Sequence, residues 1–154
     1  MQAEEQFIEK LKEEMLRSSR YKHALSAILL DVDEFHKINE AHSYQTGDRV
    51  LSVIVKIIQK TIRSVDILTR CSGDSFLIIL PNTNRREALE LAERLRENVE
   101  KRTARIEDLP AGITITLSAG QVYTNVSSSD FMRRLENTLV EGKKRERNKI
   151  YIAE

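Results

Sequence analysis

The chain has 154 residues, a length typical of one domain, and its 40% of apolar residues are enough for one hydrophobic core. The 25 Lys and Arg residues nearly balance the 24 Asp and Glu residues, and the net charge of +1 excludes a protein that binds nucleic acid or an anionic membrane by bulk charge. One cysteine, Cys71, excludes an internal disulfide, and no apolar run approaches the ~20 residues that span a bilayer. The N-terminus lacks a signal-peptide pattern, so we expect a cytoplasmic protein.

Apolar periodicity predicts the elements of the first half of the chain. Apolar residues recur every three or four positions over residues 4–18, which is typical of an amphipathic helix. The short apolar run at 25–32 predicts a buried strand, and a short polar helix is expected from 33 to 42. Residues 47–63 predict the strongest amphipathic helix. The predicted strands 67–70 and 76–80 enclose a turn that contains glycine, which indicates a β-hairpin.

The second half is expected to contain helices at 84–102 and 129–143 and strands at 113–122 and 149–153. After the N-terminal helix, this order gives a split βαββαβ core followed by one helix and one strand, which predicts an α+β fold. Leaving the flanking helices aside, we expect helices on one face of the sheet and an open second face. No linker, repeat or low-complexity stretch divides the chain, so residues 1–154 are expected to form a single domain.

Acidic residues stand at two strand ends. Asp31 and Asp33 close the predicted first strand, and Asp74 lies in the hairpin turn. If the first strand neighbours the hairpin, Asp31 and Asp74 converge, and converging carboxylates are typical ligands of Mg²⁺. A simpler interpretation is that Asp33 caps the following helix and Asp74 serves the turn. Spacing alone leaves both interpretations open.

An ordered set of motifs resembles the GGDEF domain of diguanylate cyclases: DVDEFHKIN at 31–39, GDRVL at 47–51, RSVD at 63–66, RCSGDSF at 70–76, LP at 80–81 and KKRERN at 143–148. The resemblance implies the nucleotidyl-cyclase-like α+β fold, a ferredoxin-like βαββαβ core with an extra C-terminal helix and strand. The opening segment of that family would lie before residue 1, so we expect a domain excised from a longer protein. In the family, two domains each hold one GTP and face each other, and two Mg²⁺ ions assist the formation of cyclic di-GMP.

The resemblance also implies roles for particular residues. Metal binding falls on Asp31 and Asp74. Recognition of guanine falls on Asn39 and Asp48. Contact with the triphosphate falls on Lys143 and Arg147. The signature hairpin departs from the family pattern, because it reads Ser72, Gly73, Asp74, Ser75 and Phe76. Two further departures are His36, where the family has lysine, and Ser43-Tyr44, where it has Gly-His.

The changes at Ser72 and Ser75 argue against turnover. Ser75 replaces a carboxylate by a neutral hydroxyl, so metal affinity at the site is expected to be weak or lost. Ser72 adds a Cβ where the family uses glycine, which permits a positive φ and close approach of the nucleotide. We therefore expect no intact catalytic site. GTP binding without turnover stays open, and Mg²⁺ is needed only if that binding persists.

A second motif resembles the product-binding inhibitory site of the family, which is an R-x-x-D ahead of the signature. Here it is Arg63 and Asp66, and Arg70 is expected nearby as a further phosphate contact. A guanidinium donates two hydrogen bonds to a guanine edge or a phosphate, and a carboxylate accepts from guanine N–H groups. The simpler interpretation is that Arg63 interacts with a helix C-terminus and Asp66 ends a turn.

Three functional hypotheses follow. The favoured one is a receptor for cyclic di-GMP that needs no cofactor. The second is a residual cyclase that uses Asp31 and Asp74. The third is a module that binds another protein, an active cyclase or a second copy of itself through the family's dimer face and without nucleotide. None of the three involves nucleic acid or a membrane.

Overall fold

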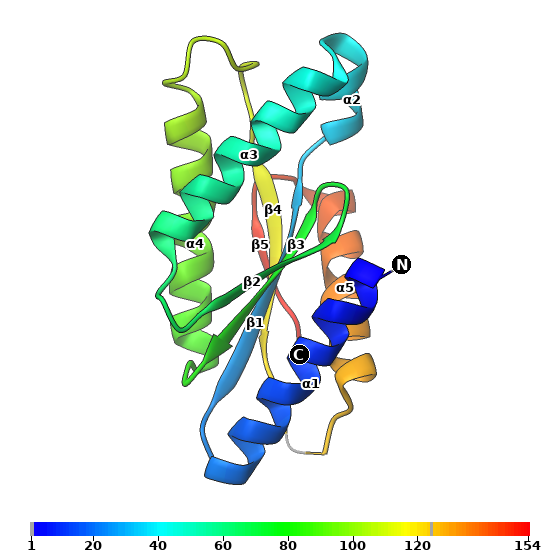
Figure 1. Ribbon diagram of the computed structural model, residues 1–154, viewed down its shortest axis with the longest axis vertical. Helices are drawn as coiled ribbons and strands as arrows, with labels where there is room; N and C mark the ends of the chain where they lie inside the picture. Colours follow the sequence, from blue (N-terminus) through cyan, green and yellow to red (C-terminus); the bar gives the residue numbers. More distant parts are fainter. Residues whose placement is uncertain (1, 124) are drawn as a thin grey trace.

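The structure is a computed structural model that describes residues 2–123 and 125–154, with side chains from residue 6 onward (Figure 1). The elements, in chain order, are α1 (Gln2–Tyr21), β1 (Leu25–Val32), α2 (Phe35–Ala41), α3 (Tyr44–Thr61), β2 (Ile67–Ser72), β3 (Ser75–Pro81), α4 (Arg85–Thr103), β4 (Ile115–Gln121), α5 (Ser128–Arg145) and β5 (Ile150–Ile152). Within the described ranges, every helix is too short or too polar to cross a membrane.

One five-stranded sheet in the order β2-β3-β1-β4-β5 organises the fold. The central strand β1 is antiparallel to both β3 and β4, and β5 adds to β4 in parallel. The split core therefore consists of β1, α3, the β2–β3 hairpin, α4 and β4. Helix α5 and strand β5 are added to it. This arrangement confirms the predicted α+β fold with a ferredoxin-like core.

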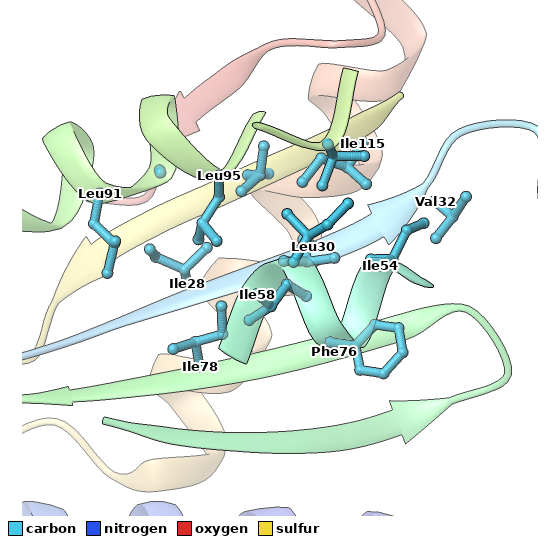
Figure 2. Close-up of a cluster of buried hydrophobic side chains, with 14 of the residues drawn as sticks. Ile28, Leu30, Val32, Ile54, Ile58, Phe76, Ile78, Leu91, Leu95 and Ile115 are labelled. Carbon is cyan, nitrogen blue, oxygen red and sulfur yellow. The ribbon is translucent and has the colours of Figure 1, made fainter. Parts of the chain in front are cut away.

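Helices cover both faces of the sheet, so the expectation of an open face was wrong. Ile28 and Leu30 of β1 belong to a core with α3 and α4, and Figure 2 shows them packed among side chains of these helices. Ala27 and Leu29 belong to a second core with α1 and α5. The apolar run of β1 is continuous because a strand that is buried on both faces needs apolar side chains at successive positions.

The tip of the hairpin lies beside the C-terminal end of β1 (Figure 1), where the Val32 N–H donates to the carbonyl of Asp74 at 3.1 Å. Strands β2 and β3 run further toward this tip than the sequence predicts, and the register shifts between Arg70 and Ser72. Ser72 then pairs with Ser75, so Gly73 and Asp74 alone form the turn. The signature residues thus meet the end of the central strand.

Helix α3 begins at Tyr44, three residues before the predicted start. The Ser43 hydroxyl accepts a hydrogen bond from the Thr46 N–H at 3.1 Å and so caps the helix. One departure from the family pattern, Ser43, therefore has a local structural role in this chain.

Candidate functional site

Asp31 and Ser75 are direct partners in the antiparallel pairing of β1 with β3. Side chains of such partners lie on the same face of the sheet with Cβ atoms ~5 Å apart. A glutamate at position 75 would therefore place a second carboxylate beside Asp31. The chain has a neutral hydroxyl there instead.

Asp31 has an internal cationic partner. The Lys143 Nζ atom lies 2.6 Å from Asp31 Oδ2, and the two side chains are 29% and 18% exposed. Lys143 belongs to the last turn of α5, on the face of the sheet to which Ala27 and Leu29 also point. The structure thus joins residues 112 positions apart, both of which the resemblance selects.

Asp74 lies close to this pair. Burial raises the pKa of the Asp74 carboxyl, and the negative charge of Asp31 raises it further. Lys143 and His36 act on the same pKa in the opposite direction. Asp31 and Asp74 therefore converge at the end of β1, and His36 faces them from the start of α2.

Asp33 does not cap α2, so that interpretation was wrong. Glu34 occupies the N-cap position with a φ of 52° and makes no side-chain cap. The Asp33 side chain turns inward, where it accepts hydrogen bonds from Thr114 Oγ1 at 2.7 Å, Thr116 Oγ1 at 2.6 Å and the Asn148 N–H at 3.0 Å. Asp33 thus ties the end of β1 to the start of β4 and to the loop after α5. Sequence analysis missed this role, because the two threonines lie 81 and 83 positions from Asp33 in the chain.

A second ion pair lies at the same end of β1. Arg147 Nη1 is 3.0 Å from Glu34 Oε1, and Lys37 Nζ is 3.3 Å from the same oxygen. Lys143 and Arg147, the two expected triphosphate contacts, therefore both point back to the β1–α2 connection. Each already has a carboxylate partner there.

The expected guanine-recognising residues meet around Gly47. Among the described side chains, the Asn39 Oδ1 atom is the one buried polar atom without a hydrogen-bond partner. A Cβ on Gly47 would lie 1.9 Å from this atom, so any larger residue there would displace the Asn39 side chain. Asp48 is exposed and lines a groove of about 590 Å³ together with Leu51. The residues that line this groove do not include Asn39, so the buried Oδ1 atom and Asp48 do not share it.

The donor set does not fit two divalent cations. Within the described ranges, no three His, Cys, Asp or Glu side chains form a group that could hold a metal ion. Asp31 and Asp74 are the two carboxylates at the hairpin, and the first is already paired with Lys143. Mg²⁺ binds through oxygen ligands, and a lone hydroxyl at Ser75 offers it no charge.

Arg63 and Asp66 form a closed ion pair. The buried Asp66 carboxylate accepts from the Arg63 backbone N–H at 2.8 Å and from Arg63 Nη2 at 2.8 Å. Arg63 Nη2 also donates to the Pro81 carbonyl and to Thr83 Oγ1, each at 2.8 Å. The hydrogen bond to Asp66 raises the pKa of the guanidinium against the opposing effect of desolvation. Asp66 therefore serves the α3–β2 turn, as the simpler interpretation has it, while the Arg63 side chain stays 52% exposed.

Arg70 lies far from this pair, so the expectation that it adds a contact there was wrong. It donates to the carbonyls of Ser72 and Gly73 and stacks on the Phe76 ring at 5.9 Å. These residues surround the hairpin turn, whereas Arg63 contacts Pro81 at the other end of β3. Six residue steps of a strand separate the two ends by ~20 Å. Arg70 thus braces the signature turn.

Comparison with known proteins agrees with the geometry. A family model described as "Diguanylate cyclase, GGDEF domain" matches residues 2–149. The probable diguanylate cyclase DgcT of Escherichia coli is 33% identical over 138 residues, which cover 88% of this chain and 30% of the relative. The chain spans about a third of the length of the curated relatives that it matches.

Solved structures show the same fold. The active GGEEF domain of a diguanylate cyclase from Vibrio cholerae has a TM-score of 0.84 and 28% identity, with coverage of 94% of this chain and 92% of that chain. The GGDEF domain of DgcB from Caulobacter crescentus, solved in complex with c-di-GMP, has a TM-score of 0.90 and 22% identity, with coverage of 98% and 88%.

Proposed function

Since the chain belongs to the GGDEF family of diguanylate cyclase domains, we propose that it is a member without cyclase activity that acts as a receptor for cyclic di-GMP. The observation that carries the first half of this proposal is the pairing of Asp31 with Ser75 across β1 and β3. The second half is supported by the half-exposed guanidinium of Arg63.

Turnover requires more negative charge than the hairpin offers. Two divalent ions that activate a hydroxyl nucleophile and neutralise a triphosphate need several carboxylate oxygens to hold them. Ser75, opposite Asp31, supplies no carboxylate where the family has one. One oxygen of the Asp31 carboxylate is already bound to Lys143. The hairpin therefore retains its backbone shape and loses the charge needed for synthesis.

Arg63 is prepared to bind a planar or anionic acceptor. Its Nε and Nη2 groups are held by Asp66, Pro81 and Thr83, which fixes the plane of the guanidinium. A guanidinium has five N–H donors, and the described contacts use only those on Nε and Nη2. The Nη1 donors are left for guanine O6 and N7 or for a phosphate, and a fixed guanidinium loses little entropy on binding. Asp66 contributes by orienting Arg63 and does not itself receive the guanine.

The ligand also agrees with what the fold accommodates elsewhere, because the DgcB domain has been crystallised with cyclic di-GMP. In this chain, the receptor role needs neither a metal ion nor GTP. It leaves the dimer face of the domain to a protein partner or a second copy.

Calorimetry with cyclic di-GMP tests the receptor. We expect saturable binding by the unmodified domain and at least a tenfold loss for Arg63→Ala, since a charge-assisted hydrogen-bond pair contributes about 1.5–3 kcal/mol. Arg63→Lys retains the charge without the planar fork and should be intermediate. Arg49→Ala is the matched control, because Arg49 is also an exposed arginine paired with an aspartate, Asp108 at 2.8 Å. An absence of binding heat, or equal affinity for Arg63→Ala and Arg49→Ala, would contradict the proposal.

Incubation with GTP and either Mg²⁺ or Mn²⁺ separates the alternatives. We expect no cyclic di-GMP. Product that forms with the unmodified domain and disappears with Asp74→Asn would establish residual cyclase activity instead. Flat titrations with both nucleotides, together with a retained protein partner, would favour the nucleotide-independent module.

A further inference from the structure

A groove of about 870 Å³ lies between the C-terminal half of α1 and the connection from β4 to α5. Both elements meet at the end of the sheet away from the hairpin tip (Figure 1). The larger apolar side chains that line the groove are Met15, Leu16, Val122, Tyr123 and Val126. Met15, Val122 and Val126 pack against the second core and stay partly exposed, whereas Leu16 and Tyr123 are 73% and 40% exposed. The second core thus reaches the surface here, and an apolar surface of this kind marks an interaction site.

The charged residues around the groove have one sign. Lys12, Lys22 and His23 line it, and no Asp or Glu does so among the residues that the structure describes there. The chain as a whole differs, because its acidic and basic residues nearly balance. Lys12 pairs with Glu9 at 3.7 Å, but both side chains are more than half exposed, so this ion pair is weak. A partner with negative charges therefore complements the rim of the groove.

Local contacts shape both walls of the groove. Lys22 has a φ of 55°, the left-handed conformation that glycine usually adopts after a helix. The His23 N–H donates to the Ser18 carbonyl at 2.9 Å and closes a Schellman-type cap at the end of α1. On the opposite wall, the Arg134 guanidinium lies 5.9 Å from the centre of the Tyr123 ring. The groove is therefore shaped before a partner binds, which lowers the entropic cost of binding.

The dimensions of the groove fit a helix. Its α1 wall runs from Lys12 to His23, a distance of ~16 Å or about three helical turns. The strands that end at the groove, β1 and β4, are interior strands of the described sheet, so neither offers an edge to which a partner strand could be added. An amphipathic helix, in contrast, binds by laying its apolar face into a groove of this length.

We propose that this groove docks an amphipathic helix of a protein partner, with its apolar face against Leu16, Val122 and Val126 and with acidic residues near Lys12 and Lys22. The acidic residues would stand about ten positions apart on the partner helix, because ~15 Å of helix separates the two lysines. The inference goes beyond the receptor function. The groove contains none of the residues assigned to nucleotide or metal binding, so docking does not depend on cyclic di-GMP.

A synthetic helical peptide of about 15 residues tests the inference. It carries leucine at every third or fourth position and glutamate on both sides of this apolar stripe. Fluorescence anisotropy of the labelled peptide measures its binding to the unmodified domain in the absence of nucleotide. We expect saturable binding with a dissociation constant below about 1 mM. The same peptide with lysine in place of each glutamate should bind at least ten times more weakly, because Lys12 and Lys22 repel it.

Variants of the domain locate the binding surface. Leu16→Glu should weaken binding of the acidic peptide by about tenfold or more, since it places a like charge where the apolar face would lie. Val140→Glu is the matched control, because Val140 is a 52% exposed apolar residue of α5 outside the groove. Lys12→Gln should weaken binding by about threefold, the size of an exposed ion pair. Lys10→Gln should leave binding unchanged, because Lys10 pairs with Glu13 away from the groove.

Thermal unfolding of each variant verifies that it is folded. The inference is overturned if the acidic peptide does not bind saturably, if the acidic and basic peptides bind equally, or if Leu16→Glu and Val140→Glu weaken binding to the same extent. Sedimentation with phosphatidylserine vesicles examines the other ligand that suits an apolar surface with a basic rim. A domain that sediments with these vesicles and does not bind the acidic peptide has a membrane-binding surface instead, and the inference is then wrong.

Cyclic di-GMP titrations of the same samples separate this inference from the receptor function. If cyclic di-GMP binds through Arg63 and the acidic peptide does not bind, the docking groove alone is refuted. If the peptide binds and cyclic di-GMP does not, the receptor function alone is refuted.

Discussion

Asp31 and Ser75 face each other across the central pair of strands. The departure from the family pattern at Ser75 therefore lies directly beside Asp31, a position to which the resemblance assigns metal binding. A serine at the first position of β3 keeps the backbone pairing that a glutamate would make, so the sheet is unaffected. Under the proposed function, the fold persists without catalysis because the fold depends on the two cores and catalysis on a few strand-end charges.

Asp33→Asn should destabilise the domain by about 2–4 kcal/mol, because hydrogen bonds to a charged acceptor are strong and their buried donors cannot find water. The carboxylate accepts from two threonine hydroxyls and one backbone N–H, and an amide can accept at only one of its two positions. Urea unfolding followed by circular dichroism measures the effect. Asp130→Asn, at an exposed helix start with a 56% exposed side chain, is the control and should change stability by less than about 0.5 kcal/mol.

A loss for Asp33→Asn no larger than that of Asp130→Asn would show that solvent satisfies the two threonines. In that case the loop after α5 would not depend on Asp33. The hydrogen bond from the Asn148 N–H to Asp33 would then not be needed to hold Lys143 and Arg147 in position.

The elements with strong apolar periodicity were predictable, and those that depend on distant partners were not. The apolar run of β1 and the helical pattern of α3 follow from local sequence. The helix starts were less predictable, because Asp33 does not cap α2 and Ser43 caps α3 ahead of its predicted start. The inward turn of Asp33 depends on Thr114 and Thr116, which lie 81 and 83 positions away. No local pattern contains that information.

The separation of Arg70 from Arg63 illustrates the same limit. Arg63 lies ahead of β2 and Arg70 lies within it, and their closeness in sequence suggested a common site. An extended strand carries its two ends far apart, whereas a helix or turn of equal length would have kept them together. The convergence of Asp31 with Asp74 was predictable for the opposite reason, since a hairpin beside β1 brings its tip to the strand end.

Asp66→Asn should destabilise the domain by about 1–3 kcal/mol. The Asp66 side chain is fully buried and accepts from the backbone and the guanidinium of Arg63. The NH₂ group of an asparagine would face N–H donors of Arg63, and these Arg63 donors would lose their acceptor. Differential scanning calorimetry measures the loss. Asp108→Asn breaks an equally short but exposed pair with Arg49 and should cost less than about 1 kcal/mol, so equal losses would contradict the prediction.

Asp74→Asn should stabilise the domain at neutral pH by about 0.5–1 kcal/mol, the size of a partly screened charge effect. Burial and Asp31 raise the pKa of Asp74 in the folded state, so ionisation of Asp74 costs folded-state stability at every pH above that raised value. The cost declines as the pH falls through the folded pKa and is absent below the ordinary carboxyl pKa. Melting temperatures of both proteins across this range should therefore converge at acidic pH. A constant difference, or a variant less stable at neutral pH, would contradict the prediction.

Gly142→Ala should destabilise the domain by about 1–2 kcal/mol, although alanine is the better helix former by about 1 kcal/mol. The added methyl group would lie 2.3 Å from one Tyr151 ring carbon and 2.5 Å from another, and the hydrogen bond from the Tyr151 hydroxyl to Glu146 resists movement of the ring. Urea unfolding measures the loss. Gly73→Ala is the control, because nothing lies within 4 Å of its added Cβ, and it should shift stability by less than about 0.5 kcal/mol. If Tyr151→Val in the Gly142→Ala background fails to restore part of the loss, the ring is not the obstacle and the anchoring of the turn that carries Lys143 has another origin.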